Sequence, residues 1–504
     1  MKAFLLSDAR SPASEQGSPH TSAAQFSAQS SKKPPPHAQK GVRLVIAFPC
    51  ATIERPCILC WDCSSSTAQS LQQLPTAFRF LSILLAAIPV LALTDDWLVQ
   101  DVSAIVAALL LLFAIGASQD DLKITVRLLG KIKLPILFPF AWMVFQIAPL
   151  SLFANSIWPT ASIALNEPLS GHISIDPGAT IRALFQYLTI ASLMVATMVF
   201  TRDRERAETT LFVMGAVTTF MSVEMLLGQF QPFTGIVPAP GNPGAASFVA
   251  ISALGAVVNA AAAVRIIERR LSRREEANAL SPILAFCLGL AGSASCLGAI
   301  IVAGRTNTLI LAGFGIAVIL LVGASRLIAP RPAALGVLFA IFALAVTGTI
   351  ALRFEDNSAL IAILRFAASA STDSLSVTQR AFADLKWVGS GVGTFDTLVP
   401  IYREFGGRPV VEPASTIAKI AIEWGRAGSF VLVFIGVQLF VVMFRGALRR
   451  GRDWFFPAAA SASILVLFCE AFCDTSLTHP SSQIILAVII GLGLSQTMGR
   501  TSGL

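Results

Sequence analysis

The residues best suited to chemistry in this chain lie in one polar stretch, from Arg353 to Gly428, of an otherwise apolar sequence. Two basic residues precede a run of alternating glycines, which a tyrosine follows: Arg380, Lys386, Gly389, Gly391, Gly393 and Tyr402. Guanidinium groups, ammonium groups and the backbone of a glycine turn can all bind phosphate oxygens. The pattern therefore predicts a phosphate-binding loop, and the alternative is a tight turn that caps the preceding helix.

The glycines do not form a nucleotide-binding P-loop. Such a loop has a Lys–Ser/Thr pair directly after its glycines, whereas Thr394 and Phe395 follow here. Near the N-terminus, Cys57, Cys60 and Cys63 have ligand-like spacing, but no second pair of ligands follows, so reduced thiols are the alternative to a metal site. We expect no nucleotide, metal ion or other cofactor.

The composition indicates a membrane protein, because 55% of the residues are hydrophobic and 13% are charged. The net charge of +8 comes from basic residues in short clusters between apolar runs. Such clusters are typical of the cytoplasmic loops of membrane proteins, so we expect no nucleic acid partner.

Apolar runs near 20 residues can cross a bilayer of roughly 30 Å as helices, and the sequence has about twelve of them. We therefore predict an all-α, polytopic integral membrane protein. The expected spans are 78–96, 102–118, 134–154, 181–200, 209–228, 244–264, 281–303, 306–324, 333–351, 426–444, 455–473 and 481–498. Residues 1–77, rich in Ser, Ala, Gln and Pro, predict a disordered cytoplasmic tail, and 499–504 a short C-terminal tail.

The orientation follows from the basic residues, which occupy alternate loops. One set of loops carries most of them, for example Lys123, Arg204, Arg269, Arg331 and Arg449, whereas the other set of short loops has only Arg305. The positive-inside rule then puts both termini in the cytoplasm and the 352–425 loop, between the ninth and tenth spans, outside. In a Gram-negative cell this side is the periplasm.

Several ionisable residues in or beside the expected spans lie towards that outer face: Arg182, Glu224, Arg305, Glu423, Arg426 and Glu470. Each could simply extend to the membrane surface. Their common side instead favours one polar cavity under the external loop, because charges within a membrane protein are costly and tend to be functional.

The central motif resembles the O-antigen ligases and the O-antigen or exopolysaccharide polymerases, which are bacterial inner-membrane glycosyltransferases. The residues that carry the resemblance are Arg380, Trp387, Gly389, Gly391, Gly393, Thr394, Phe395 and Tyr402, followed by Glu423, Gly425 and Gly428. Weaker similarities occur at 241–245, 304–306 and 474–480. The resemblance covers residues 78–498 and leaves the N-terminal tail unmatched.

The resemblance implies a twelve-helix-like domain with a large periplasmic loop. It also implies transfer or polymerisation of an undecaprenyl-pyrophosphate-linked glycan onto a lipid or glycan hydroxyl. Because the leaving pyrophosphate gains negative charge, Arg305 and Arg380 are the first candidates to stabilise it. Glu423 is the family-matched base, and the expected substrate contacts are Arg182, Lys386, Gly391, Gly393, Tyr402 and Arg426.

The chain departs from the family where members often carry a His–Asn pair nine residues before the motif glutamate, since Ala414 and Ser415 stand there. A histidine mechanism is therefore not implied, and the choice between ligase and polymerase stays open. The alternative bases are Glu412, Glu470, His172 and His479. From a different class of protein, a lipid-linked glycan flippase without transferase chemistry is the alternative function.

Overall fold

A computed structural model describes residues 61–94, 96–116, 119–228, 245–272, 280–327, 367, 370–384, 386–403 and 412–497. All regular elements in these ranges are helices. The expected span at 333–351, residues 241–244 of the similarity at 241–245 and the C-terminal tail lie outside the described residues. So do residues 1–60 of the expected tail, whereas its last part is helical, because α1 (Trp61–Leu91) begins at Trp61.

Seven of the described helices are long and apolar enough to cross a membrane. They are α2 (Asp96–Ile115), α6 (Pro177–Phe200), α7 (Arg204–Leu227), α8 (Ala245–Ser272), α9 (Leu280–Val302), α10 (Thr306–Leu327) and α15 (Thr416–Arg449). The pair α3 (Gln119–Lys131) and α4 (Lys133–Ile147), bent by 72°, makes an eighth if it is one span. The prediction of a multi-pass α-helical membrane protein is confirmed, and the described helices do not extend to twelve spans.

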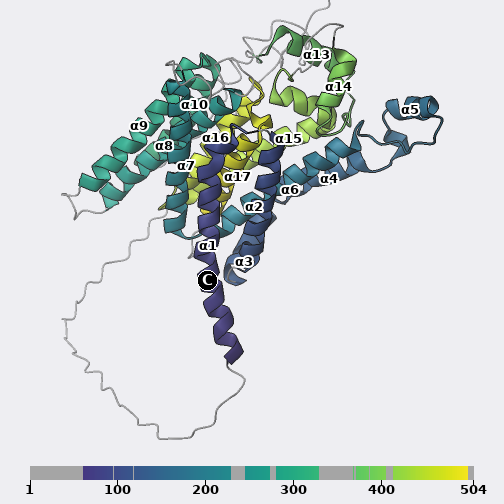
Figure 1. Ribbon diagram of the computed structural model, residues 1–504. Helices are drawn as coiled ribbons and strands as arrows, with labels where there is room; N and C mark the ends of the chain where they lie inside the picture. Colours follow the sequence, from purple (N-terminus) through teal and green to yellow (C-terminus); the bar gives the residue numbers. More distant parts are fainter. Residues whose placement is uncertain are drawn as a thin grey trace, which may run out of the picture. The chain divides into compact units, whose positions relative to one another are not determined.

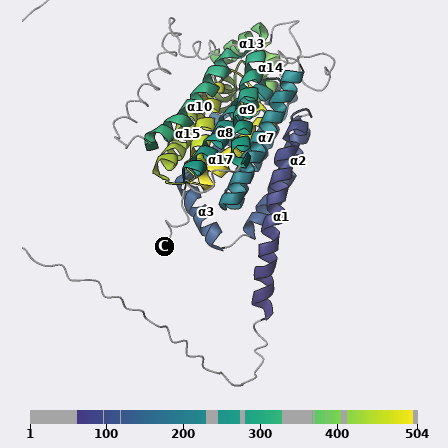
Figure 2. The same ribbon diagram turned by 90° about the vertical axis from the view of Figure 1, so that its left-hand side faces the viewer.

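Helix α8 lies at the centre of the bundle and packs against α7, α9, α10 and α16 (Phe455–Glu470) (Figures 1 and 2). Its many alanines, with Gly255, let these neighbours approach closely. Asn259 of α8 donates hydrogen bonds to the hydroxyl of Thr219 (3.0 Å) and to the carbonyl of Gly215 (3.3 Å) on α7. The amide of Asn259 is thus paired across two helices inside the bundle.

Two further apolar helices, α16 and α17 (Pro480–Ser495), have 16 residues each and are about 24 Å long. Nearly all of their side chains are buried, and α17 packs along α6 and against α16. Because protein surrounds both helices, their neighbours rather than lipid cover most of their surface. This burial accounts for apolar helices that are shorter than a bilayer is thick.

An ionic cluster ties three elements together where α7 begins. Glu208 of α7 pairs with Arg204 at 3.0 Å and with Arg265 of α8. Arg204 also pairs with Asp453, just before α16, at 3.1 Å. Since the side chains of Glu208, Arg265 and Asp453 are buried, removal of one partner would leave an uncompensated charge inside the protein.

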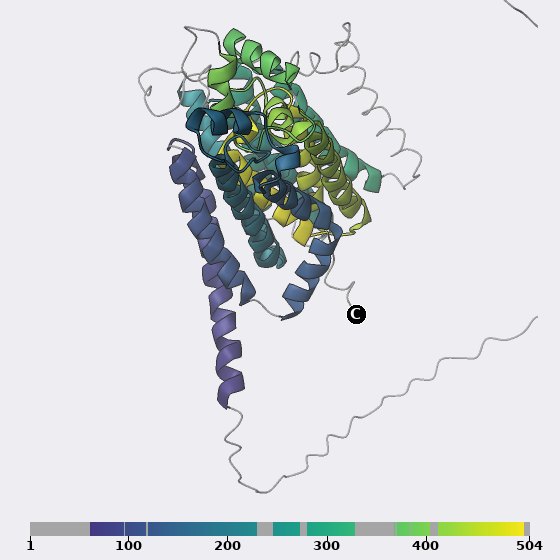
Figure 3. The same ribbon diagram turned by 90° about the vertical axis from the view of Figure 1, so that its right-hand side faces the viewer.

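Two short helices, α13 (Thr372–Ala383) and α14 (Phe395–Tyr402), pack on the first part of α15. Figures 1 and 3 show them together at one end of the bundle. They share a small core with α15 that includes Phe382, Phe395, Leu398, Ala418 and Ile422. We call this assembly the cap.

Helix α15 has 34 residues, which gives a length of about 51 Å, well above a hydrocarbon thickness of roughly 30 Å. Gly425 interrupts it with φ 73° and ψ 178°. The part after the break, 426–449, is about 36 Å long and suffices to cross a bilayer. The part before the break, 416–424, belongs to the cap.

The break predicts that Gly425→Ala destabilises the protein. A Cβ at this position would lie 2.4 Å from the carbonyl oxygen of Trp387, and the positive φ alone costs about 1–3 kcal/mol for a residue with a side chain. We expect a lower midpoint of thermal unfolding in detergent.

The matched control is Gly313→Ala in α10, where no heavy atom lies within 4 Å of the added Cβ. This substitution should leave the midpoint unchanged or raise it slightly, since alanine favours helix. Equal midpoints for the two variants would contradict the proposed role of the break.

Candidate functional site

The glycine turn, Lys386–Thr394, binds through its backbone to the break in α15. The N–H groups of Ser390 and Gly391 donate to the carbonyls of Ile422 and Glu423, each at 3.1 Å. In return, the N–H of Ala427 donates to the carbonyl of Trp387 at 3.1 Å. The turn therefore pairs backbone groups that an interrupted helix would otherwise leave without partners.

The geometry favours the tight-turn interpretation of the glycines over a phosphate cradle. Gly389 has φ +81°, and a Cβ there would lie 2.2 Å from the carbonyl oxygen of Glu423. Gly391 packs against Ser174, and Gly393 lies against the carbonyl of Ala179. The predicted substrate contacts Gly391 and Gly393 thus face protein, and the N–H of Gly391 is already bonded.

Gln146 of α4 is hydrogen-bonded to the glycine turn, and it was not among the residues predicted from the sequence. It is fully buried, and its Nε2 donates to the carbonyls of Val388 (2.9 Å) and Glu423 (3.0 Å). Its Oε1 accepts the N–H of Val392 at 3.1 Å. The available signal was a neutral amide inside an apolar run, because such a group is costly in a membrane protein unless it is bonded.

Glu423, the predicted base, lies under the turn. Its carboxylate accepts the N–H of Phe395 at 3.2 Å and is also bonded to the N–H of Gly393, at the start of α14. A carboxylate at a helix N-terminus stabilises that helix through its unpaired N–H groups and its dipole. The contacts of Glu423 position α14, and its side chain is buried.

A cavity of about 540 Å³ lies between the turn, the cap and the start of α5 (Ile157–Leu165). Its walls combine apolar and polar groups: Asn155, Ser156, Ile157, Thr160, Ile175, Ala381, Asp384, Lys386, Gly389, Ser390, Leu398, Ile401, Tyr402 and Ile422. Seven of these 14 residues are polar or charged, so the cavity suits a ligand group that is itself polar. We call it the cap cavity.

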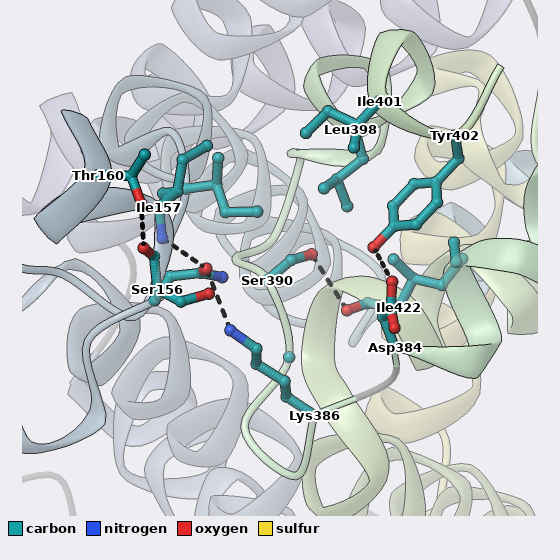
Figure 4. Close-up of a pocket in the computed structure, with 14 residues that line it drawn as sticks. Ser156, Ile157, Thr160, Asp384, Lys386, Ser390, Leu398, Ile401, Tyr402 and Ile422 are labelled. Atoms are coloured by element: carbon teal, nitrogen blue, oxygen red, sulfur yellow. Dashed lines mark hydrogen bonds between the residues drawn. The ribbon is translucent and has the colours of Figure 1, made fainter. Parts of the chain in front are cut away.

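Figure 4 shows Lys386 and Tyr402 on different sides of the cap cavity. The ammonium group of Lys386 donates to Oδ1 of Asn155 at 3.1 Å, and the hydroxyl of Tyr402 donates to Oδ2 of Asp384 at 2.9 Å. Arg380 donates from its guanidinium to the carbonyl of Tyr402 at 3.0 Å. Lys386 and Tyr402 thus line one cavity, and Arg380 is bonded to the backbone of Tyr402 at its edge.

Tyr402 is placed as a hydrogen-bond donor. Burial, together with the hydrogen bond to Asp384, raises the pKa of Tyr402 to about 12. The hydroxyl therefore stays protonated at neutral pH and cannot serve as a base there.

Arg305 lies elsewhere, in a cavity of about 220 Å³ that Gly304–Thr308, Cys473 and Asp474 line. We call it the arginine cavity. Thr308 donates to Oε1 of the fully buried Glu470 at 3.3 Å, and Oε2 of Glu470 has no hydrogen-bond partner among the described residues. Burial raises the pKa of Asp474, and the charge of Arg305 opposes this shift. Arg305 is therefore close to two carboxyl groups.

The first part of α15 connects the two cavities. Thr416 donates its N–H to the carbonyl of Asp474 at 2.7 Å, beside the arginine cavity, and Ile422 lines the cap cavity. Ile422 follows Thr416 by six residues of helix, which is a rise of about 9 Å. Arg305 therefore lines a different cavity from Lys386 and Tyr402, at the other end of this segment.

The remaining predicted residues lie at neither cavity. Arg182 is on the exposed face of α6, and the guanidinium of exposed Arg426 lies 6.0 Å from the centroid of the Trp387 ring. Nδ1 of His172 is bonded to the carbonyl of Ile147 at 2.7 Å. His479 lies close enough to Asp474 to lower its pKa by charge.

Among the residues that the structure describes, no group of three His, Cys, Asp or Glu side chains is placed to hold a metal ion. Cys57 and Cys60 lie outside them. No protein-family model matches the chain, and no curated protein matches it. The fold and the site together define a multi-pass α-helical membrane protein with polar cavities beneath a helical cap.

The Gln146 contacts predict that Gln146→Glu weakens the protein. The replacement keeps the size of the side chain, but its carboxyl group cannot donate both bonds to the carbonyls of Val388 and Glu423. We expect a loss of about 1–3 kcal/mol for each buried carbonyl that stays unpaired, measured as a lower midpoint of thermal unfolding in detergent.

The control is Gln379→Glu, on the exposed side of α13. It makes the same chemical change in solvent and should have almost no effect. If Gln146→Glu unfolds at the same temperature as the control, Gln146 does not hold the turn.

Proposed function

We propose that the protein is a membrane glycosyltransferase of the O-antigen ligase or polymerase type. It transfers or polymerises an undecaprenyl-pyrophosphate-linked glycan at the periplasmic face of the bacterial inner membrane. The observation that carries the proposal is the cap cavity, since residues of the central motif form its wall at the end of an apolar helical bundle. The proposal includes about twelve spans, cytoplasmic termini and a periplasmic loop at 352–425.

The transfer forms a bond between an acceptor hydroxyl oxygen and the anomeric carbon. The bond from that carbon to the pyrophosphate breaks, and undecaprenyl pyrophosphate leaves with the bonding electrons. Cations placed in advance lower the barrier because they stabilise the negative charge that develops on the leaving group. Lys386 lines the cap cavity and Arg380 is bonded at its edge, and these positions suit that role.

The proton of the acceptor hydroxyl needs a carboxylate. Glu423 is committed to the N-terminus of α14, whereas Asp474 lines the arginine cavity and Glu470 lies beside it. The proposal therefore assigns the proton to the carboxyl pair beside Arg305, at the far end of the first part of α15.

The proposal predicts that Arg380→Ala, which removes a cation beside the leaving group, and Arg305→Ala, which removes the cation beside the proton-accepting carboxyl pair, each lower product formation by about 100-fold. The assay uses purified protein in proteoliposomes with a polyprenyl-pyrophosphate glycan and a hydroxyl acceptor. Arg452→Ala, at an exposed arginine before α16, is the matched control and should keep full activity.

Insertion into the membrane and thermal unfolding should be unchanged in both active-site variants. Normal glycan length and attachment in cells that carry either variant would contradict the assignment. The surface glycan of a deletion strain separates the alternatives: unattached long chains indicate a ligase, and single-repeat chains a polymerase. Glycan that accumulates on the cytoplasmic leaflet would instead indicate a flippase and overturn the proposal.

A further inference from the structure

The segment between α4 and α6 contains an unusually long run without charge. No charged residue occurs from Leu134 to Asn166, and the run includes most of α4, a short 3-10 helix η1 (Ser151–Phe153) and α5. Only part of this run can form a span. Figure 1 shows α5 at the outer edge of the described helices, beyond α4.

Helix α4 is too short to cross a bilayer alone. Its 15 residues extend about 22 Å from Lys133, against a hydrocarbon thickness of roughly 30 Å. A chain that leaves α4 at Ile147 is therefore still near the far membrane boundary. The residues of η1 and the start of α5 follow at that depth.

The outward surface of η1 and α5 is apolar. Four large side chains are strongly exposed: Leu152 (86%), Phe153 (49%), Ile163 (83%) and Leu165 (63%). Because apolar surface costs about 25 cal/mol per Å² in water, such a cluster is normally shielded from water by protein or lipid. We call these four residues the apolar edge.

The apolar edge continues the exposed surface of α4. Leu137, Phe140 and Val144 are exposed at helical spacing, and the rings of Phe145 and Phe153 join α4 to η1 with a centroid distance of 6.0 Å. Whatever covers the exposed face of a membrane helix reaches the edge without interruption. For a helix of this composition, that cover is lipid.

The other side of the segment is bonded to the protein. The N–H of Asn155 donates to the carbonyl of His172 at 2.8 Å, and Nε1 of Trp158 donates to the carbonyl of Ser174 at 3.1 Å. Asn155, Ser156 and Thr160 then line the cap cavity. One short segment thus carries an apolar surface on one side and a wall of the polar cavity on the other.

We propose that η1 and α5 form a non-spanning element embedded in the membrane boundary, with lipid acyl chains over Leu152, Phe153, Ile163 and Leu165. The cap cavity then opens at the lipid surface. Resting on the proposed function, the inference is that the cavity takes the polar head of a substrate whose lipid tail stays in the bilayer, along the apolar edge.

The depth of the edge tests the first part. A fluorescent amino acid is inserted at position 152 or 163 of the full chain, which is reconstituted with phospholipids brominated at different depths. Quenching at both positions should approach that at Leu137 and be strongest for shallow bromines. The control position is Thr397, exposed on α14 of the cap, where little quenching is expected. Quenching at 152 and 163 no greater than at 397 would overturn the proposal.

A kinetic comparison tests the second part. The double variant Leu152→Ser with Ile163→Ser should raise KM about tenfold or more for a long-chain polyprenyl donor, with kcat unchanged. It should not change KM for a water-soluble donor with a short chain. Equal effects on both donors would contradict a role of the edge in holding the lipid tail.

The control is Ile105→Ser with Leu112→Ser on α2, at 63% and 66% exposure, which removes similar apolar groups far along the chain from the cavity. Its KM for either donor should stay unchanged. If the unaltered protein makes no product from either donor, the proposed transferase function fails, and the quenching result alone decides whether the element is embedded.

Discussion

The backbone pairing between the glycine turn and the break in α15 is the interaction on which the cap depends. A helix interrupted inside a protein leaves N–H and carbonyl groups that must find partners, because an unpaired buried group costs about 1–3 kcal/mol. The turn supplies these partners at Ile422, Glu423 and Ala427. The backbones of the turn and of α15 can approach so closely because Gly389 and Gly425 have no Cβ.

Several positions near the cavities follow from this pairing. The turn ends where α14 begins, so Glu423 can bond the first N–H groups of α14 and fix its direction. The turn starts at Lys386, whose ammonium group reaches Asn155 and joins the cap to the segment before α5. Gln146 adds α4 to the same joint. Three segments that are far apart in sequence therefore define one cavity through a single buried contact region.

The sequence predicted local features well and long-range ones poorly. Apolar runs predicted helices because a membrane span must satisfy its own backbone hydrogen bonds, and the motif predicted Arg380, Lys386 and Tyr402 as candidate site residues. The separation of Arg305 from Arg380 could not be predicted, since it depends on how α10 and α16 pack around α8. Gln146 stands out in the sequence as an amide inside an apolar run, but its partners Val388, Val392 and Glu423 are far away in the sequence, so its three bonds could not be predicted.

The start of α15 bears on which group would take the proton of the acceptor hydroxyl in the transferase that we propose. Ala414 has 1% exposure and donates its N–H to the hydroxyl of Thr378 at 3.2 Å, and Ser415 caps the helix through the N–H of Ala418 at 3.3 Å. A larger imidazole at position 414 would have to displace the closely packed core of the cap. These two positions thus build the helix start, and the N–H groups of Thr416 and Ile417 at the same helix start donate to the carbonyls of Asp474 and Ala471. A proton acceptor beside the first part of α15 is therefore better sought in that segment, where Asp474 lines a cavity with Arg305, than at the positions that cap the helix.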